Sequence, residues 1–246
     1  MGEILADYNG YDYKGKFWSG REYEDLSDRK AIQRLLPKQA KVFIDIAGGY
    51  GRLANEYLPK NYKKTIIFDY SKTLLADAKK EFGDKITTVQ GDIYDLPFKD
   101  GEADAMLMVR ATHHFDDLPA VIKQLARVLA PNGTLVIELA NKKTLAKIFK
   151  YWAKKSDINP FSHEPSKLKE LNKGNFYNYH PKYIEQLFAK NGLKIERVLS
   201  VSNFRSPRLK KLFGHKLLAK LESPLQYLLA PLRFGPSIYY QVRKVK

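Results

Sequence analysis

Cysteine is absent from this chain of 246 residues, and so is any long apolar run. Without cysteine there is no disulfide bond, no thiolate metal ligand and no cysteine nucleophile, so covalent catalysis would need another residue type. No segment approaches the roughly 18 uninterrupted apolar residues that a membrane span needs. The start of the chain is acidic and rich in tyrosine, unlike a signal peptide. We therefore predict a cytoplasmic protein and expect no metal site.

Acidic residues are scarce in the C-terminal part of the chain. The formal net charge is +16, but residues 141–246 hold 23 Lys and Arg against 6 Asp and Glu, whereas residues 1–140 are nearly neutral. A basic region can attract an anionic partner such as RNA, anionic lipid or a phosphorylated metabolite. It can equally be a solvated, Lys-rich surface that aids solubility. The charge alone leaves both interpretations open.

Segments typical of strands and of helices alternate through the first 140 residues. Short apolar segments rich in β-branched residues predict five buried strands, at 41–45, 65–69, 86–90, 105–109 and 134–139. Between them, Ser71 and Asp117 are expected to cap two helices, the second of which ends at Pro131, Asn132 and Gly133. This alternation predicts an α/β fold with a doubly wound sheet and helices on both faces. The length suits a single domain over residues 1–246.

The remainder of the chain departs from this alternation. Residues 141–192 and 202–236 are predicted to be basic, partly helical additions, with a helix that begins at Pro181. Residues 207–232 predict two amphipathic helices broken at Pro224. Strands at 193–201 and 238–242 bring the predicted sheet to seven strands.

The most informative stretch is 42–52, with the sequence VFIDIAGGYGR. A strand ends in an acidic residue there and runs through glycines into a helix. Such a turn lets the backbone approach a ligand closely, at the carboxyl end of the strand. Similar turns also serve dinucleotides and phosphates, so the turn by itself does not choose the ligand.

The residues Asp45, Ala47, Gly49 and Gly51 resemble the Asp-x-Gly-x-Gly-x-Gly motif of class I S-adenosylmethionine-dependent methyltransferases, which have a Rossmann-like fold. Ala47 stands where the motif has its first glycine, which cofactor binding should tolerate if that residue has a negative φ. The resemblance implies S-adenosyl-L-methionine as cofactor. Backbone amides from Gly48 to Gly51 would bind its methionine carboxylate. Asp45 would accept a hydrogen bond from its amino group or would orient the turn.

Later segments extend the resemblance in order along the chain. In the family, an acidic residue at the end of the second strand holds the ribose hydroxyls, which implies this role for Asp69, with Tyr70 beside the adenine. The segment 90–93 resembles the family's Gly-Asp segment, where Asp92 would accept from the adenine amino group next to Ile93. The turn at 129–134 matches the Leu-x-Pro-x-Gly segment that precedes the fifth strand.

The segment 109–117 is similar to the His-His segment of ubiquinone and menaquinone biosynthesis methyltransferases. The resemblance places His113 and His114 at the acceptor pocket, where either is a candidate catalytic base for a hydroxyl or an acidic carbon. A free amine would need no base. Alternatively, one histidine packs against the cofactor and the other caps the next helix. Arg110 contacts cofactor or substrate, or forms a surface ion pair.

The first 40 residues resemble the helix that relatives fold over the cofactor as a lid. Trp18, Arg21 and Tyr23 would contribute aromatic faces and a cation to an adenine ring and a carboxylate. Ordinary packing of a first helix is the alternative interpretation. The additions that follow residue 140 supply further candidates for the acceptor pocket, since specificity is often carried by such segments. These candidates are Phe161, His163, Phe176, Tyr177, Tyr179 and His180.

We predict methyl transfer to a small-molecule acceptor, with three alternatives. RNA methylation would use the basic C-terminal part, although the fourth strand lacks the Asn/Asp-Pro-Pro-aromatic motif of base-amine methyltransferases. An isoprenoid or lipid acceptor, with peripheral membrane contact, would use the Leu- and Lys-rich segment 209–229. A protein of this fold could also bind the cofactor without catalysis. The sequence does not identify the acceptor, the methylated atom or the oligomeric state.

Overall fold

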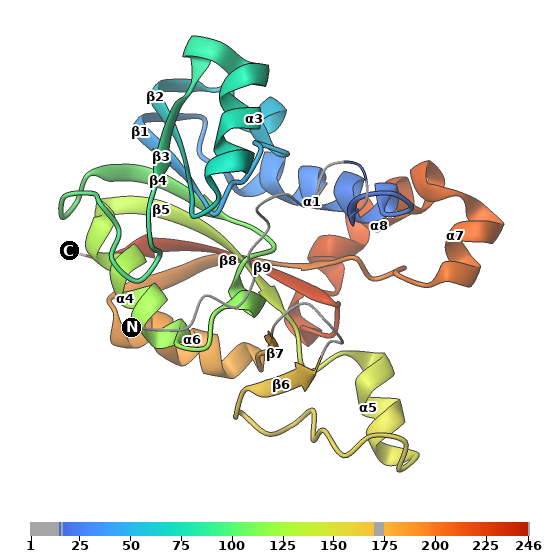
Figure 1. Ribbon diagram of the computed structural model, residues 1–246. Coiled ribbons are helices and arrows are strands. Elements are labelled where there is room, and N and C mark those ends of the chain that lie inside the picture. Colours follow the sequence, from blue (N-terminus) through green and yellow to red (C-terminus); the bar gives the residue numbers. More distant parts are fainter. Residues whose placement is uncertain (1–14, 16, 170–174, 246) are drawn as a thin grey trace.

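The computed structural model describes residues 15, 17–169 and 175–245, and its centre is a seven-stranded sheet (Figure 1). The strand order is β3-β2-β1-β4-β5-β9-β8; the first five strands are parallel, and β9 runs antiparallel to both of its neighbours. The predicted α/β class and the seven-stranded sheet are confirmed. The strands are β1 (Gln39–Ile46), β2 (Asn61–Asp69), β3 (Thr87–Gln90), β4 (Ala103–Met108), β5 (Leu129–Ala140), β8 (Leu193–Val201) and β9 (Ser237–Lys244).

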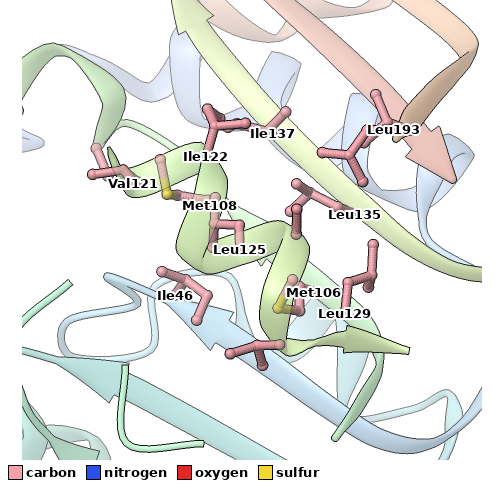
Figure 2. Close-up of a cluster of buried hydrophobic side chains, with 14 of the residues drawn as sticks. Ile46, Met106, Met108, Val121, Ile122, Leu125, Leu129, Leu135, Ile137 and Leu193 are labelled. Carbon is pink, nitrogen blue, oxygen red and sulfur yellow. The ribbon is translucent and has the colours of Figure 1, made fainter. Parts of the chain in front are cut away.

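Helices cover both faces of this sheet because successive strand residues point to opposite sides. On one face Met106 and Ile137 pack against α4 (Leu118–Val128), whose apolar stripe carries Ile122 and Leu125 (Figure 2). On the other face the neighbouring Leu107 packs in a cluster with α1 (Glu22–Leu35) and α2 (Ala54–Tyr57). Helix α6 (Pro181–Lys190) joins α4 on the first face, and α3 (Lys72–Phe82) packs on β2.

The predicted helix caps are confirmed. The Ser71 side chain accepts a hydrogen bond from the Leu74 N–H at 3.3 Å, and the Asp117 side chain accepts from the Ala120 N–H at 3.0 Å. Each bond satisfies a backbone donor that the first helical turn leaves without a partner. Ser71 comes two residues after the end of β2, so its cap fixes where the chain turns back over the sheet.

The end of α4 differs from its prediction. The helix ends at Val128, and the Pro-Asn-Gly sequence lies inside β5 instead. Ala103 of β4 pairs with Leu129, but Ala105 pairs with Thr134, so the residues between them bulge out of the ladder. Asn132 has a φ of +61° there, a conformation that asparagine tolerates better than most residues. The prediction that Pro131, Asn132 and Gly133 end the helix is therefore wrong, because these residues form the bulge inside β5.

The C-terminal additions contain α5 (Leu145–Trp152), a small hairpin of β6 (Ser166–Lys169) and β7 (Asn175–Asn178), α7 (Pro207–Phe213) and α8 (His215–Leu228). The predicted break at Pro224 is wrong: the chain breaks at Gly214, whose φ is +71°. Pro224 lies inside α8, where contacts on either side hold the helix to α1. Glu222 accepts from the Tyr23 hydroxyl at 2.9 Å, and Gln226 donates to the Ser27 carbonyl at 3.0 Å.

Candidate functional site

The glycine turn after β1 is built so that side chains are excluded from it. A Cβ at Gly48 would lie 2.8 Å from the Asp45 carboxyl carbon, and one at Gly51 would lie 2.7 Å from the Phe82 ring. Gly49 and Gly51 have φ values of +56° and +77°, which glycine adopts without steric cost. The turn is therefore a tight backbone cradle at the carboxyl edge of the sheet, where open α/β sheets bind ligands.

Ala47 enters this turn in the left-handed conformation, with a φ of +55°. The condition set for it, a negative φ, is therefore not met. For an L-residue with a side chain this conformation costs about 1–2 kcal/mol. Residue 47 thus keeps a left-handed backbone conformation although alanine replaces the first glycine of the motif.

We expect Ala47→Gly to stabilise the protein by about 1 kcal/mol, because glycine removes the cost of the left-handed conformation. Urea unfolding measures the change. The same substitution at the exposed Ala76, inside α3, is the matched control and should destabilise by about 1 kcal/mol. Equal signs for the two variants would contradict the strain at Ala47.

Asp69, the last residue of β2, connects the glycine turn to the next helix. One carboxylate oxygen accepts from the Gly49 N–H and the other from the Ser71 N–H, both at 2.8 Å. A carboxylate offers about four lone-pair sites, so both oxygens can still accept from a ligand. Burial raises the pKa of Asp69, and the backbone hydrogen bonds oppose that rise.

Asp45 lies beneath the turn and is buried. Burial raises the pKa of Asp45 to about 7, a rise that the charge of Asp69 reinforces and that Tyr57 and Arg52 oppose. The Tyr57 hydroxyl donates to the Asp45 carboxylate at 3.0 Å. A carboxyl group with this pKa changes its charge near neutral pH.

A cavity above the carboxyl edge collects most of the predicted cofactor-binding residues, and we call it the first cavity. Its lining includes Trp18, Asp45, Ala47, Gly48, Gly49, Asp69, Tyr70, Asp92, Ile93, Arg110 and His114. Gly51, Arg21, Tyr23 and His113 do not line it. Residues that the sequence reasoning missed also contribute, among them Tyr50, Arg52, Phe68, Leu74, Gly91 and Tyr94. Tyr50 and Arg52 lie within the stretch 42–52, so their positions beside the glycines could have identified them as lining residues.

The backbone amides of the glycine turn are already in use. The Gly48 N–H donates to the Phe68 carbonyl, the Gly49 N–H to Asp69, and the Gly51 N–H to the Gly48 carbonyl. These three amides thus have partners within the protein. The cation closest to the turn in sequence is Arg52, whose guanidinium stacks 3.8 Å from the centre of the Trp18 ring.

The three predicted lid residues, Trp18, Arg21 and Tyr23, lie in three different places. Trp18 lines the first cavity, as predicted. Arg21 lies 4.1 Å over the Phe17 ring and lines a neighbouring cavity. Tyr23 is fully buried away from both, because its ring packs on Leu218 of α8. The ordinary packing of a first helix therefore describes Tyr23, while residues 1–14 and 16 of the expected lid lie outside the described residues.

Arg110 forms a buried ion pair and not the surface pair considered from the sequence. Its guanidinium contacts the carboxylate of Asp28 at 2.9 and 3.2 Å, and Asp28 is fully buried. Asp28 also accepts from Arg52 at 3.1 Å and from the Tyr239 hydroxyl at 2.7 Å. These cations hold the pKa of Asp28 below its usual range despite burial. Asp28 thereby fixes both cations that line the first cavity.

The two histidines lie between the first cavity and a larger second cavity of about 770 Å³. Their ring centres are 4.0 Å apart; His114 lines the first cavity and His113 the second. His113 stacks on Phe176 with ring centres 4.1 Å apart. Burial lowers the pKa of His114 to about 4. Burial also lowers the pKa of His113 well below its usual value, and the charges of His114 and Arg110 add to that effect. Both rings are therefore neutral at neutral pH.

Two of the acceptor-pocket candidates after β5 stabilise the fold through hydrogen bonds to the backbone. The Tyr179 hydroxyl donates to the Phe115 carbonyl, and His180 caps α6 by accepting from the Lys182 N–H at 3.2 Å. Phe176 is the one member of the predicted set that lines the second cavity. Among the described residues, no group of three or more His, Asp and Glu is placed to hold a metal ion.

Comparison with known proteins gives a consistent result. Residues 44–137 match the model of a methyltransferase domain. The chain is 29% identical over 177 residues to the demethylmenaquinone methyltransferase of Thermus thermophilus, covering 68% of this chain and 76% of the relative. It is 31% identical over 153 residues to the ubiquinone/menaquinone biosynthesis C-methyltransferase of Caulobacter vibrioides, covering 56% of this chain and 60% of the relative.

A solved structure shows the same fold over most of the chain. The protein from Listeria monocytogenes, described as an S-adenosylmethionine-dependent methyltransferase, superposes with a TM-score of 0.66 over 91% of this chain and 99% of its own, at 16% identity. At that identity the likeness concerns the fold alone.

Proposed function

Because the chain belongs to the family of S-adenosylmethionine-dependent methyltransferases, we propose that it transfers a methyl group to a small-molecule acceptor. One observation carries the proposal: Asp45, Asp69 and Asp92, from the ends of three strands, line one cavity together with a glycine cradle. S-adenosylmethionine supplies a methyl group that is already activated, so the protein mainly has to position the acceptor and exclude water.

The residues of the first cavity fit this cofactor. Asp69 keeps free lone pairs for the ribose hydroxyls, and Asp92 offers an acceptor to the adenine amino group. Tyr70 is half exposed at the cavity wall, where its ring can cover the adenine. We assign the methionine carboxylate to Arg52, a cation of the cavity wall that is held in place by Asp25, Asp28 and Trp18.

We expect cofactor affinity to depend on pH through Asp45. The charged carboxylate attracts the cofactor's ammonium group, whereas the protonated form does not. Because the pKa of Asp45 is about 7, the dissociation constant should rise roughly tenfold as the pH falls from 8 to 6. Calorimetry at several pH values measures this, and Asp45→Asn should remove most of the dependence. An equally steep profile in that variant would assign the titration to another group.

The histidine pair lies where an acceptor would meet the first cavity. His114 lines that cavity and is neutral at neutral pH, so it can accept a proton, but with a pKa of about 4 it is a weak base. His113 stacks on Phe176 and shapes the wall. We therefore propose His114 as the candidate base and His113 as a packing residue. The names of the relatives, with demethylmenaquinone and ubiquinone, support a small ring-bearing acceptor.

The experiment is methyl transfer from labelled S-adenosylmethionine. Purified protein would be incubated with the reduced, demethylated quinones and with a small-molecule extract, and products would be identified by mass. Label that moves into an organic product supports the proposal. Cofactor that binds but never loses its label would support a non-catalytic cofactor-binding protein instead.

A lipid acceptor is the second candidate, because apolar side chains are exposed on α7 and α8. Among the described residues no helix is long and apolar enough to span a bilayer. Surface binding remains testable by flotation with vesicles of anionic lipid, in the presence and absence of salt. The exposed set comprises Leu212, Phe213, Leu217, Leu221 and Leu228.

A further inference from the structure

The second cavity lies directly beside the first. Trp18 and Arg110 line both, and the adjacent rings of His113 and His114 lie between them. Its walls come from the carboxyl end of β5, from α5 and from the β7 strand of the hairpin. A volume of about 770 Å³ is within the range of sites for small molecules. The cavity is therefore placed to hold the acceptor next to the methyl group.

Positive charge dominates this cavity. Five cationic side chains and two carboxylates line it: Arg21, Arg110, Lys147, Lys150 and Arg205, with Glu24 and Glu138. Two of the five cations pair with carboxylates of the protein. Arg110 pairs with the buried Asp28 at 2.9 Å, and Arg205 lies 3.5 Å from Glu24.

Lys147 is a half-buried cation of this cavity. Its ammonium group donates to the Asn141 carbonyl at 2.9 Å, and no carboxylate of the described residues pairs with it. Burial and, after it, the nearby charges of Arg205, Lys142 and Lys150 together lower the pKa of Lys147 to about 8. A buried cation without a counter-ion is costly, and a bound anion removes that cost. The Lys147 ammonium group can therefore bind a carboxylate of a ligand.

The remaining walls favour a flat, aromatic ligand. Phe17, Trp18 and Phe176 line the cavity, and the His113 ring stacks on Phe176 within it. Flat rings pack well against such faces. The aromatic wall lies on the side of the histidine pair, and Lys147 lies on α5. A ligand held by both would turn its ring toward the first cavity and its charge toward α5.

We infer that the methyl acceptor is a small aromatic carboxylic acid, whose carboxylate is bound by Lys147 and whose ring lies against Phe176 and Trp18. This rests on the proposed function, because it identifies the substrate class of the same site. Lys147 is a specificity-determining residue in this arrangement. It holds the acceptor by the group that does not react.

The test is binding of matched acids and amides to the protein loaded with S-adenosylhomocysteine. The probes are 4-hydroxybenzoate and 4-hydroxycinnamate, against 4-hydroxybenzamide and 4-hydroxycinnamide, followed by calorimetry. We expect at least one acid to bind about tenfold or more tighter than its amide, as for hydrogen bonds to charged groups. Lys147→Met should remove the difference, Lys147→Arg should keep most of it, and Lys123→Met, on the exposed face of α4, should leave it unchanged.

The affinity for S-adenosylhomocysteine is measured first for each variant, so that failure of the proposed function can be distinguished from failure of the aromatic-acid inference. If the unmodified protein does not bind S-adenosylhomocysteine, the proposed function is refuted. Normal affinity in Lys147→Met shows that the variant is folded and keeps the first cavity. Three results at normal S-adenosylhomocysteine affinity would overturn the inference that the acceptor is an aromatic carboxylic acid. These are equal binding of acids and amides, binding of neither, and an unchanged preference for the acid in Lys147→Met.

Discussion

Asp69→Ala should weaken the binding of S-adenosylmethionine roughly 100-fold, the loss expected for two hydrogen bonds to a charged group. The Asp69 carboxylate is the proposed acceptor for the ribose hydroxyls. It also holds the glycine turn through the Gly49 N–H and α3 through the Ser71 N–H. Its removal therefore takes away direct contacts and loosens the cradle. Isothermal titration calorimetry measures the change.

The control for this variant is Asp77→Ala, on the exposed side of α3. It removes the same charge from α3 without touching the turn, so affinity should stay within about twofold. Circular dichroism and urea unfolding show whether Asp69→Ala remains folded. Unchanged affinity in a folded Asp69→Ala protein would remove Asp69 from the ribose site.

Asp28→Asn should destabilise the protein by about 3–5 kcal/mol, the cost of leaving buried charges without their partner. Asp28 is fully buried and accepts hydrogen bonds from Arg110, Arg52 and the Tyr239 hydroxyl. The asparagine keeps the volume but not the charge, so two guanidinium groups lose much of their compensation. Urea unfolding gives the free energy.

Asp100→Asn is the matched control for Asp28→Asn. Asp100 also pairs with an arginine, Arg127, at 2.8 Å, but its own side chain is 81% exposed. Exposed pairs contribute about 0–1 kcal/mol, so this variant should change stability little. A similar, small effect at both positions would mean that the Asp28 network is not a strong stabilising element.

The parts of the fold that depend on local sequence were predictable. Strand β8 has the predicted bounds, and Ser71 and Asp117 cap the helices assigned to them, because a cap and an apolar stripe are readable within a few residues. The bulge at the start of β5 was not predictable in this way. Its register with β4 depends on how Leu129 and Thr134 fit the neighbouring strand.

The candidate site shows the same division. Glycines and carboxylates at strand ends identified the first cavity, since parallel strands bring these ends together. Contacts between distant segments decided the rest. Tyr23 looked like a lid residue, but its hydroxyl donates to Glu222, 199 residues away, and turns the ring from the cavity. Lys147 is one of many lysines in the sequence, and only the fold places it on the wall of the second cavity.

The central claim is that the first cavity binds S-adenosylmethionine. Calorimetry of the folded protein with S-adenosylmethionine, and separately with S-adenosylhomocysteine, tests it most directly. We expect both compounds to bind one per chain, at the same site, and to compete with each other. A folded protein that gives no binding heat with either compound, over a range of temperatures, would contradict the assignment of the cavity and everything built on it.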